Sequence, residues 1–247
     1  PPSGVAAASG GNHGAAVAYA AHTLGHGAAI FVPEIVRPAK RAAIEAAGAQ
    51  IHIGGARYAE ALAACAAYQA ETGAIDIHAY DAPLTIAGQG TVAAEWEAQS
   101  EGLDTVLVAV GGGGLISGIA AWFAGRVKVV GVEPEHSRCL HAALEAGHPV
   151  DVDVESIAAD SLGARSTGAL NFQIANTHLA EVALVTDAAI EEAMRTLWER
   201  ARILTEPGGA AAYAALLSGA YAPTPGERVG VLVCGANTDP SSFSALL

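Results

Sequence analysis

The sequence has 247 residues, and 12 Lys and Arg stand against 25 Asp and Glu, which gives a formal net charge of −13 at pH 7. An acidic surface repels phosphate backbones and so argues against nucleic-acid binding. A hydrophobic content of 52% with only 15% charged residues excludes a disordered chain, and 3 widely spaced cysteines favour neither a disulfide framework nor a structural zinc site. We therefore expect a globular protein of the reducing cytoplasm.

The first third of the chain alternates short β-rich runs with alanine-rich helical stretches. Strands are expected at 4–8, 28–32, 50–53 and 74–78, and helices at 12–24, 38–47 and 58–72. Pro38 favours a helix start at that position. Such alternation predicts a parallel sheet with helices on both faces.

The same alternation continues after Asp81, near which we expect a boundary between two α/β lobes, 3–80 and 81–247. Helices are expected at 91–100, 115–124, 139–146, 187–204 and 210–217, and strands at 105–110, 127–132, 183–186 and 228–234. The stretch 148–180 has no regular pattern. The uncharged run 105–125 is long enough to span a bilayer, but each glycine at its centre costs about 1 kcal/mol inside a helix. It predicts a strand, a glycine loop and a helix, and no membrane partner.

The first segment that could form part of a binding site runs from Ser9 through Gly10, Gly11, Asn12 and His13 to Gly14. It lies between a predicted strand and a predicted helix. The first N–H groups of a helix have no partner within it and attract anions. The plain alternative is a turn in which Asn12 caps the helix.

The second segment is Gly111, Gly112, Gly113 and Gly114, between a buried strand and a helix. Consecutive N–H groups in such a loop form a concave nest for phosphate. The lysine of a P-loop is absent and a strict GxGxxG pattern fails. Glu133 ends the next strand, where the ribose-binding acid of a dinucleotide fold would lie. A tight turn without a ligand is the plain alternative.

Two further segments follow near the end of the chain. Cys234-Gly235-Ala236-Asn237 ends the last predicted strand, and Glu206-Pro207-Gly208-Gly209-Ala210 leads into a helix. Ligands of open α/β sheets bind beyond the carboxyl ends of strands. Taken alone, Cys234 is typical of a buried small hydrophobic residue and Glu206 of an acid at a helix start.

In this order the segments resemble the fold-type-II pyridoxal-phosphate enzymes, above all the serine/threonine dehydratases and serine racemases. The matching runs are Ser9–Gly14, Ala87–Thr91, Gly111–Gly114, Glu206-Pro207 and Cys234–Asn237. The resemblance implies a tryptophan-synthase-β-like α/β fold of two open, twisted, mostly parallel sheets with helices on both faces. It also implies a small domain, 3–80, and a large cofactor-binding domain, 81–247, whose N-terminal part is missing from this sequence.

The resemblance implies roles for individual residues. Gly111–Gly114 would hold the phosphate of pyridoxal phosphate, and Cys234 would face its pyridine nitrogen with Glu206 nearby. Asn12 would bind the 3′-oxygen of the ring. The substrate carboxylate would be bound by Ser9, Gly10, Asn12 and His13. The family's reaction converts a β-hydroxy amino acid such as L-threonine or L-serine to a 2-oxo acid and ammonia, and its members are expected to be homodimers.

Departures from the family pattern sharpen this interpretation. Racemases carry a second serine where this chain has Gly10, which favours dehydration. Their divalent-metal site uses an Asp where this chain has Cys139, so we expect no metal. The Schiff-base lysine is expected upstream of Pro1, because neither Lys40 nor Lys128 matches its position.

Two other functions compete with the dehydratase. Gly111–Gly114 with Glu133 would also suit an NAD-dependent oxidoreductase with a Rossmann-like site, although Ser9–His13 would then have no role. A catalytically incomplete relative would keep the phosphate nest without the lysine. The sequence leaves open which β-hydroxy amino acid is the substrate.

Overall fold

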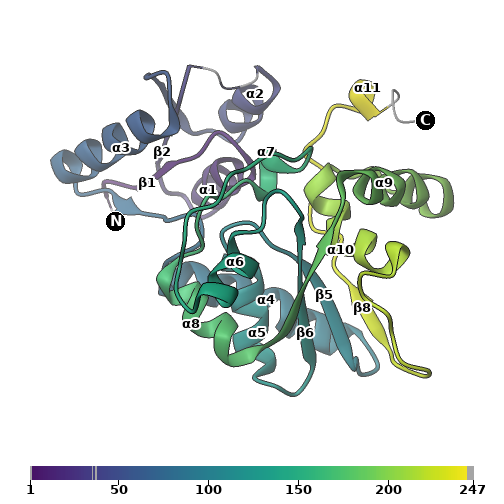
Figure 1. The fold of residues 1–247 in the computed structure, drawn as a ribbon. Helices are drawn as coiled ribbons and strands as arrows, with labels where there is room; N and C mark the ends of the chain where they lie inside the picture. The colour runs from purple at the N-terminus through teal and green to yellow at the C-terminus, as the bar shows by residue number, and fades with distance from the viewer. Residues whose placement is uncertain (1, 35, 37, 244–247) are drawn as a thin grey trace. The chain divides into compact units, whose positions relative to one another are not determined.

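The structure, a computed structural model, describes residues 2–34, 36 and 38–243. The chain divides into two compact units, Pro1–Ala79 and Tyr80–Leu247, which we call the N-terminal and the C-terminal unit (Figure 1). Each unit contains a four-stranded sheet, and the paired strands of the described residues are parallel. The predicted fold class is thereby confirmed.

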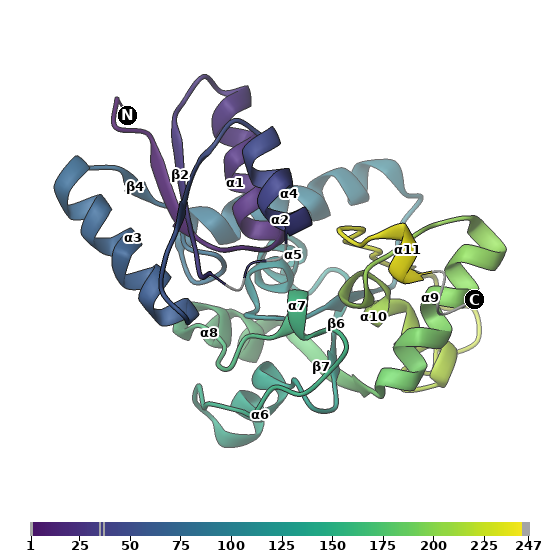
Figure 2. The same ribbon diagram turned by 90° about the horizontal axis from the view of Figure 1, so that it is seen from above.

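The N-terminal unit has helices on both faces of its sheet. The strands are β1 (Val5–Ala8), β2 (Ala28–Val32), β3 (Gln50–Ile53) and β4 (Ile75–Asp76), in the order β3-β2-β1-β4, and the helices are α1 (Asn12–Thr23), α2 (Pro38–Ala46) and α3 (Tyr58–Thr72). Successive strand residues point to opposite faces. Ala6 and Phe31 accordingly pack against Cys65 of α3, whereas Ala7 and Ile30 pack with residues of α1 and α2. Helix α3 thus covers one face of the sheet, and α1 and α2 cover the other (Figure 2).

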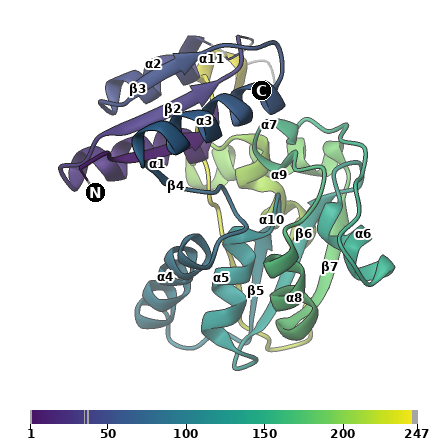
Figure 3. The ribbon, with the colours of Figure 1, turned by 90° about the vertical axis from the view of Figure 1, so that its left-hand side faces the viewer.

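The C-terminal unit repeats this arrangement on a larger scale. Its strands are β5 (Thr105–Ala109), β6 (Lys128–Pro134), β7 (Leu179–Val185) and β8 (Val229–Val231), in the order β7-β6-β5-β8. Its helices are α4 (Pro83–Gln99), α5 (Gly114–Phe123), α6 (Cys139–Ala146), α7 (Ala159–Leu162), α8 (Ala169–His178), α9 (Asp187–Ala201), α10 (Pro207–Ser218) and α11 (Pro240–Phe243). Helices α4, α5 and α8 cover one face of the sheet (Figure 3).

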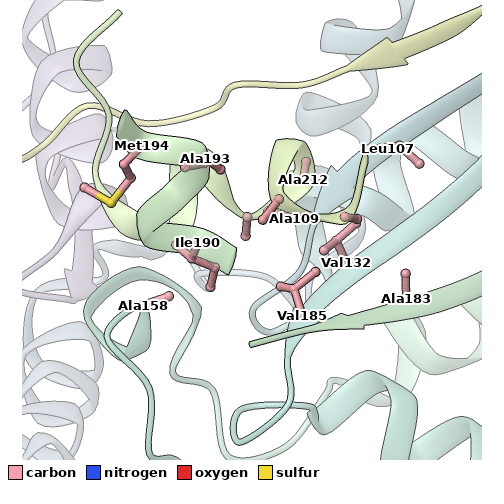
Figure 4. Packing of buried hydrophobic residues seen from close by; sticks show 14 of the residues in the cluster. Leu107, Ala109, Val132, Ala158, Ala183, Val185, Ile190, Ala193, Met194 and Ala212 are labelled. Carbon is pink, nitrogen blue, oxygen red and sulfur yellow. The ribbon is translucent and has the colours of Figure 1, made fainter. Parts of the chain in front are cut away.

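The other face of the sheet is covered by α9 and α10. Val132 and Val185 of the sheet point toward Ile190 of α9 and Ala212 of α10 (Figure 4). Five alanines of α10 are fully buried, and such short side chains allow the helix to lie close to the strands. The alanine-rich composition therefore reflects close packing of helices on a sheet.

Several predicted elements differ from the structure in their bounds. Helix α4 begins at Pro83 instead of residue 91. Proline is favoured at the first position of a helix, and the glycines at 88 and 90 interrupt the helical sequence pattern that would have indicated this earlier start. Strands β4 and β8 are shorter than predicted, β7 begins at Leu179 instead of residue 183, and 148–180 contains α7 and α8. Helix α9 ends at Ala201 instead of residue 204, and α10 begins at Pro207 instead of residue 210. The run 105–125 is a strand, a turn and a helix, and none of the helices within the described ranges is long and apolar enough to cross a membrane.

The strand order places the candidate segments at equivalent points of the two sheets. In each unit, the second and third strands lie on one side of the first strand and the fourth lies on the other side. The chain therefore changes direction beside β1 and beside β5, and open α/β sheets bind ligands outside the carboxyl ends of strands at such switch points. Ser9 follows β1, Gly111 follows β5, and Cys234 follows β8, the neighbour of β5.

Candidate cofactor site

The glycine turn Gly111–Gly114 presents unbonded N–H groups at the carboxyl end of β5. Gly113 caps α5 with a φ of 99°, in the left-handed region that favours glycine. Among the residues that the structure describes, no acceptor bonds the N–H groups of Gly112, Gly113 or Gly114. Three successive free donors at a helix start form an anion-binding nest.

The turn has no room for side chains. A Cβ atom at Gly112 would overlap the ring of Tyr80 and lie 2.6 Å from its Cε1, and one at Gly114 would lie 2.8 Å from the Cα of Tyr80. A Cβ at Gly111 would lie 3.2 Å from the Cα of Leu162. The run of glycines thus reflects close packing against Tyr80 and α7 as well as the exposed N–H groups.

Glu206 and Cys234 lie side by side next to α10. The Glu206 side chain is buried and lies against Gly235, whose carbonyl accepts the Glu206 N–H at 3.2 Å. Solvent reaches the Cys234 side chain, yet the surrounding protein atoms and then the charge of Glu206 raise the pKa of its thiol to about 11. Cys234 is therefore a neutral thiol at pH 7.

These surroundings predict selective but slow alkylation of one cysteine. Cys65 and Cys139 are each only 1% exposed, so we expect iodoacetamide to modify Cys234 alone. Because the thiolate is the nucleophile, the rate at pH 8 should be low and should rise with pH toward 11. Glu206→Gln should accelerate the reaction at pH 8, since it removes a negative charge beside the thiol. Mass spectrometry checks both points, and earlier modification of Cys65 or Cys139 would contradict the assignment.

The turn after β1 begins the first helix of the N-terminal unit. The Ser9 N–H donates to the carbonyl of Phe31 at 3.1 Å, and the Ser9 hydroxyl accepts the Gly11 N–H at 3.3 Å. Gly11 is the N-cap of α1, without a side-chain cap, so the plain alternative in which Asn12 caps the helix is wrong. Asn12 is the exposed first residue of α1, and its side chain is on the surface where a ligand can reach it.

The imidazole of His13 has a structural partner. Its Nε2 lies 2.8 Å from the carbonyl oxygen of Ile77, the residue that follows β4. Burial is the main reason that the pKa of His13 is lowered, so the ring is neutral at pH 7 and donates its Nε2–H to Ile77. The ring therefore ties α1 to the end of β4, and a ligand would meet the backbone of this residue.

Glu133 caps a helix. Its side chain is fully buried, and its two oxygens accept the N–H groups of Leu140 at 2.9 Å and His141 at 2.8 Å, at the start of α6. Burial raises the pKa of Glu133 to about 7 despite these bonds. A carboxylate with no exposed surface does not reach a ribose, so the interpretation of Glu133 as a ribose-binding acid is wrong. Within the described ranges, no three His, Cys, Asp or Glu side chains are grouped to hold a metal ion.

Replacing Glu133 should weaken the fold. Glu133→Gln keeps one acceptor oxygen and sets an amide N–H₂ against a backbone N–H, which should lower the free energy of unfolding by about 1–3 kcal/mol. Urea denaturation measures the change. The exposed Glu135, two residues away, supplies the control, since Glu135→Gln should leave the stability unchanged. Equal stability of Glu133→Gln and the unmodified protein would contradict the cap.

The structure places Lys128 away from the glycine turn. Lys128 begins β6, its Nζ lies 3.0 Å from the Glu181 carboxylate and 4.8 Å from the centre of the Tyr221 ring. The glycine turn follows the carboxyl end of β5, and the two strands are parallel. Lys40 lies in α2 of the N-terminal unit, and its side chain is outside the described residues. The lysine upstream of Pro1 stays a prediction.

Comparison with known proteins identifies the family. The family model described as pyridoxal-phosphate dependent enzyme matches residues 1–235. The chain belongs to this family. It is 35% identical over 244 residues to a phenylserine dehydratase of Ralstonia pickettii, covering 98% of this chain and 74% of that protein. It is 36% identical over 247 residues to an L-threonine ammonia-lyase of Geobacter sulfurreducens, covering 99% of this chain and 61% of that protein.

Solved structures of the family have the same fold. The processed form of threonine deaminase isoform 2 from Solanum lycopersicum superposes with a TM-score of 0.92 at 29% identity, over 99% of this chain and 72% of that chain. Maize serine racemase superposes with a TM-score of 0.92 at 32% identity, over 98% of this chain and 76% of that chain. The chain thus spans between about three fifths and three quarters of the length of these four proteins.

Proposed function

We propose that the protein is a pyridoxal-phosphate-dependent dehydratase that converts a β-hydroxy amino acid, such as L-threonine or L-serine, to a 2-oxo acid and ammonia. The observation that carries the proposal is the glycine turn, whose free N–H groups stand at the switch point of the C-terminal sheet. The relatives named phenylserine dehydratase and L-threonine ammonia-lyase support the reaction class. A cytoplasmic location and a homodimer are proposed from the family resemblance alone.

The residues of the C-terminal unit fit the cofactor. A phosphate dianion accepts hydrogen bonds, and the turn Gly111–Gly114 offers the N–H groups of Gly112, Gly113 and Gly114 as donors. The net charge of −13 opposes anions, so this local nest has to supply the attraction. The neutral thiol of Cys234 suits an uncharged pyridine nitrogen, which a carboxylic acid would protonate.

The protonation state of the pyridine nitrogen affects which reaction the bound cofactor favours, and Cys234 would face this nitrogen. When bound, pyridoxal phosphate withdraws electrons from the α-carbon of an amino acid, and an uncharged ring withdraws them less strongly, which favours prompt loss of a leaving group at the β-carbon. Cys234 keeps its proton at neutral pH and thereby leaves the ring nitrogen uncharged. We infer that Cys234 and Glu206 select elimination in this way.

The N-terminal unit would bind the substrate carboxylate. The N–H groups at the start of α1 have no acceptor within the helix, and the Ser9 hydroxyl lies beside them at the Gly11 N–H. With His13 neutral and bonded to Ile77, these donors are backbone and hydroxyl groups. Asn12 contributes its carboxamide to the 3′-oxygen of the cofactor ring in this proposal.

Gly10 supports elimination over racemisation. A Cβ atom there would lie 3.1 Å from Cγ2 of Val36 and 3.6 Å from Cγ1 of Val32, so a serine at this position requires Val36 to move. The surroundings of Gly10 are thus apolar and closely packed. A serine such as the second one that racemases place at this point would require the Val36 side chain to shift by a few tenths of an ångström.

Release of 2-oxo acid from a panel of β-hydroxy amino acids tests the function. The panel should include L-threonine, L-serine, phenylserine and β-hydroxyaspartate, with 2-oxo acid and ammonia measured together. We expect the two products in equal amounts and only with pyridoxal phosphate present. NAD-dependent turnover would favour the oxidoreductase, and a protein that binds pyridoxal phosphate without turning over any member of the panel would favour the incomplete relative.

A further inference from the structure

The carbonyl groups of the glycine turn are bound from behind by buried side chains. The carbonyl oxygen of Gly112 accepts the Thr167 hydroxyl at 3.1 Å and the Asn171 side-chain amide at 3.1 Å. The carbonyl oxygen of Gly111 accepts the Cys139 thiol at 3.2 Å. Thr167 is 4% exposed and Asn171 is fully buried, so neither competes for a ligand in solvent.

The direction of these carbonyls fixes the direction of the N–H groups. In a planar trans peptide the C=O and N–H bonds point to opposite sides. The carbonyl of Gly112 points to Thr167 and Asn171, so the N–H of Gly113 points away from them. The carbonyl of Gly111 likewise sets the N–H of Gly112. Glycines have the most backbone freedom of all residues, and without these bonds the turn would sample other directions.

The side chains that bind the turn are themselves held in place. The Asp81 carboxylate accepts the N–H groups of Ala169 at 3.2 Å and Leu170 at 3.0 Å, which caps α8 from outside the helix. Asn171 also donates to the carbonyl of Tyr80 at 3.1 Å, and the ring of Tyr80 covers Gly112. The start of α8, the segment Tyr80-Asp81 and the glycine turn are therefore linked by hydrogen bonds.

We propose that Thr167 and Asn171 are positioning residues that preorganise the Gly112 and Gly113 N–H groups for the phosphate of the bound cofactor. The inference rests on the proposed function, because it assigns the nest to a phosphate monoester. Binding to a preorganised site costs less conformational entropy than binding that has to order the turn. The two residues act through the backbone and do not touch the ligand.

Thr167 provides the cleaner test, since its side chain bonds Gly112 whereas Asn171 also holds Tyr80. Thr167→Val keeps the shape and removes the hydroxyl donor. Equilibrium dialysis of the intact protein should show an affinity for pyridoxal phosphate up to about 10-fold weaker, which corresponds to the upper end of what one neutral intramolecular hydrogen bond contributes. Affinity for pyridoxal, which lacks the phosphate, should stay unchanged. Thr167→Ser, which keeps the hydroxyl, should restore most of the affinity for pyridoxal phosphate.

Thr177, an exposed residue of α8, supplies the matched control, because Thr177→Val should change neither affinity. Asn171→Leu should weaken pyridoxal phosphate binding more than Thr167→Val does, and if it fails to fold the Thr167 variants decide. Wild-type affinity of Thr167→Val for pyridoxal phosphate would overturn the proposal, as would an equal loss for pyridoxal. If the unmodified protein does not prefer pyridoxal phosphate over pyridoxal, the proposed function fails and this inference with it.

Discussion

Gly112→Ala is expected to remove most of the bound cofactor. The new methyl group would overlap the ring of Tyr80, whose carbonyl is bonded to Asn171 and whose hydroxyl lies 3.4 Å from the Ser166 carbonyl. Because the backbone carbonyl and the hydroxyl of Tyr80 both have partners, moving the ring away would break contacts, and we expect the turn to move instead. Overpacking of this kind costs about 1–3 kcal/mol, which corresponds to roughly 5- to 150-fold weaker binding if the cost falls on the bound state.

The cofactor that remains after gel filtration measures the effect. Gly88→Ala is the matched control, because a Cβ atom at Gly88 in α4 meets nothing within 4 Å. This control should retain its cofactor and gain about 1 kcal/mol of stability from helix propensity. Full retention by Gly112→Ala would show that the glycine turn is not the phosphate site. Gly112→Asp would add a negative charge to the same overlap and should be at least as severe.

Asn12→Ala is expected to lower kcat by roughly 100-fold, the cost of removing one preorganised hydrogen-bond donor from a reacting system. The loss would come from poorer orientation of the ring through its 3′-oxygen. Stability should be unchanged, because Asn12 is exposed and Gly11 is the N-cap of the helix. Steady-state 2-oxo acid release and thermal denaturation separate the two effects.

A second surface residue of α1 controls for nonspecific damage. Tyr19 is 67% exposed on the same helix, and Tyr19→Ala should leave both turnover and melting temperature as they were. Unchanged turnover in Asn12→Ala would remove this residue from the proposed site. A parallel fall in melting temperature would instead assign it a structural role in α1.

Helices with clear end signals could be predicted closely from the sequence. The predicted ranges 58–72 and 139–146 agree with α3 and α6, which end at Gly73 and Gly147 with φ of 72° and 78°. Glycine in the left-handed conformation is the commonest helix end. The stretch 148–180 lacked such signals, because α7 has only 4 residues and the buried residues of α8 are Asn171 and Ala175, which give no apolar stripe.

The glycine turn could be predicted because its signal is local, whereas the residues around it could not. Thr167 and Asn171 bind Gly112 from 55 and 59 residues away in the sequence. Nothing in a single sequence indicates that α8 packs behind this turn, since such contacts follow from tertiary folding. The interpretation of Glu133 as a ribose-binding acid was wrong for the same reason. Its spacing from the glycines in the sequence suited that role, but in the folded chain its carboxylate caps α6.

Cofactor-dependent release of 2-oxo acid from L-threonine tests the central claim most directly. The intact protein would be freed of cofactor by dialysis and then supplied with pyridoxal phosphate, pyridoxal or NAD. Activity should return with pyridoxal phosphate and should stay near background with pyridoxal or NAD, because the glycine turn binds the phosphate. Equal recovery with pyridoxal, or recovery with NAD, would contradict the account.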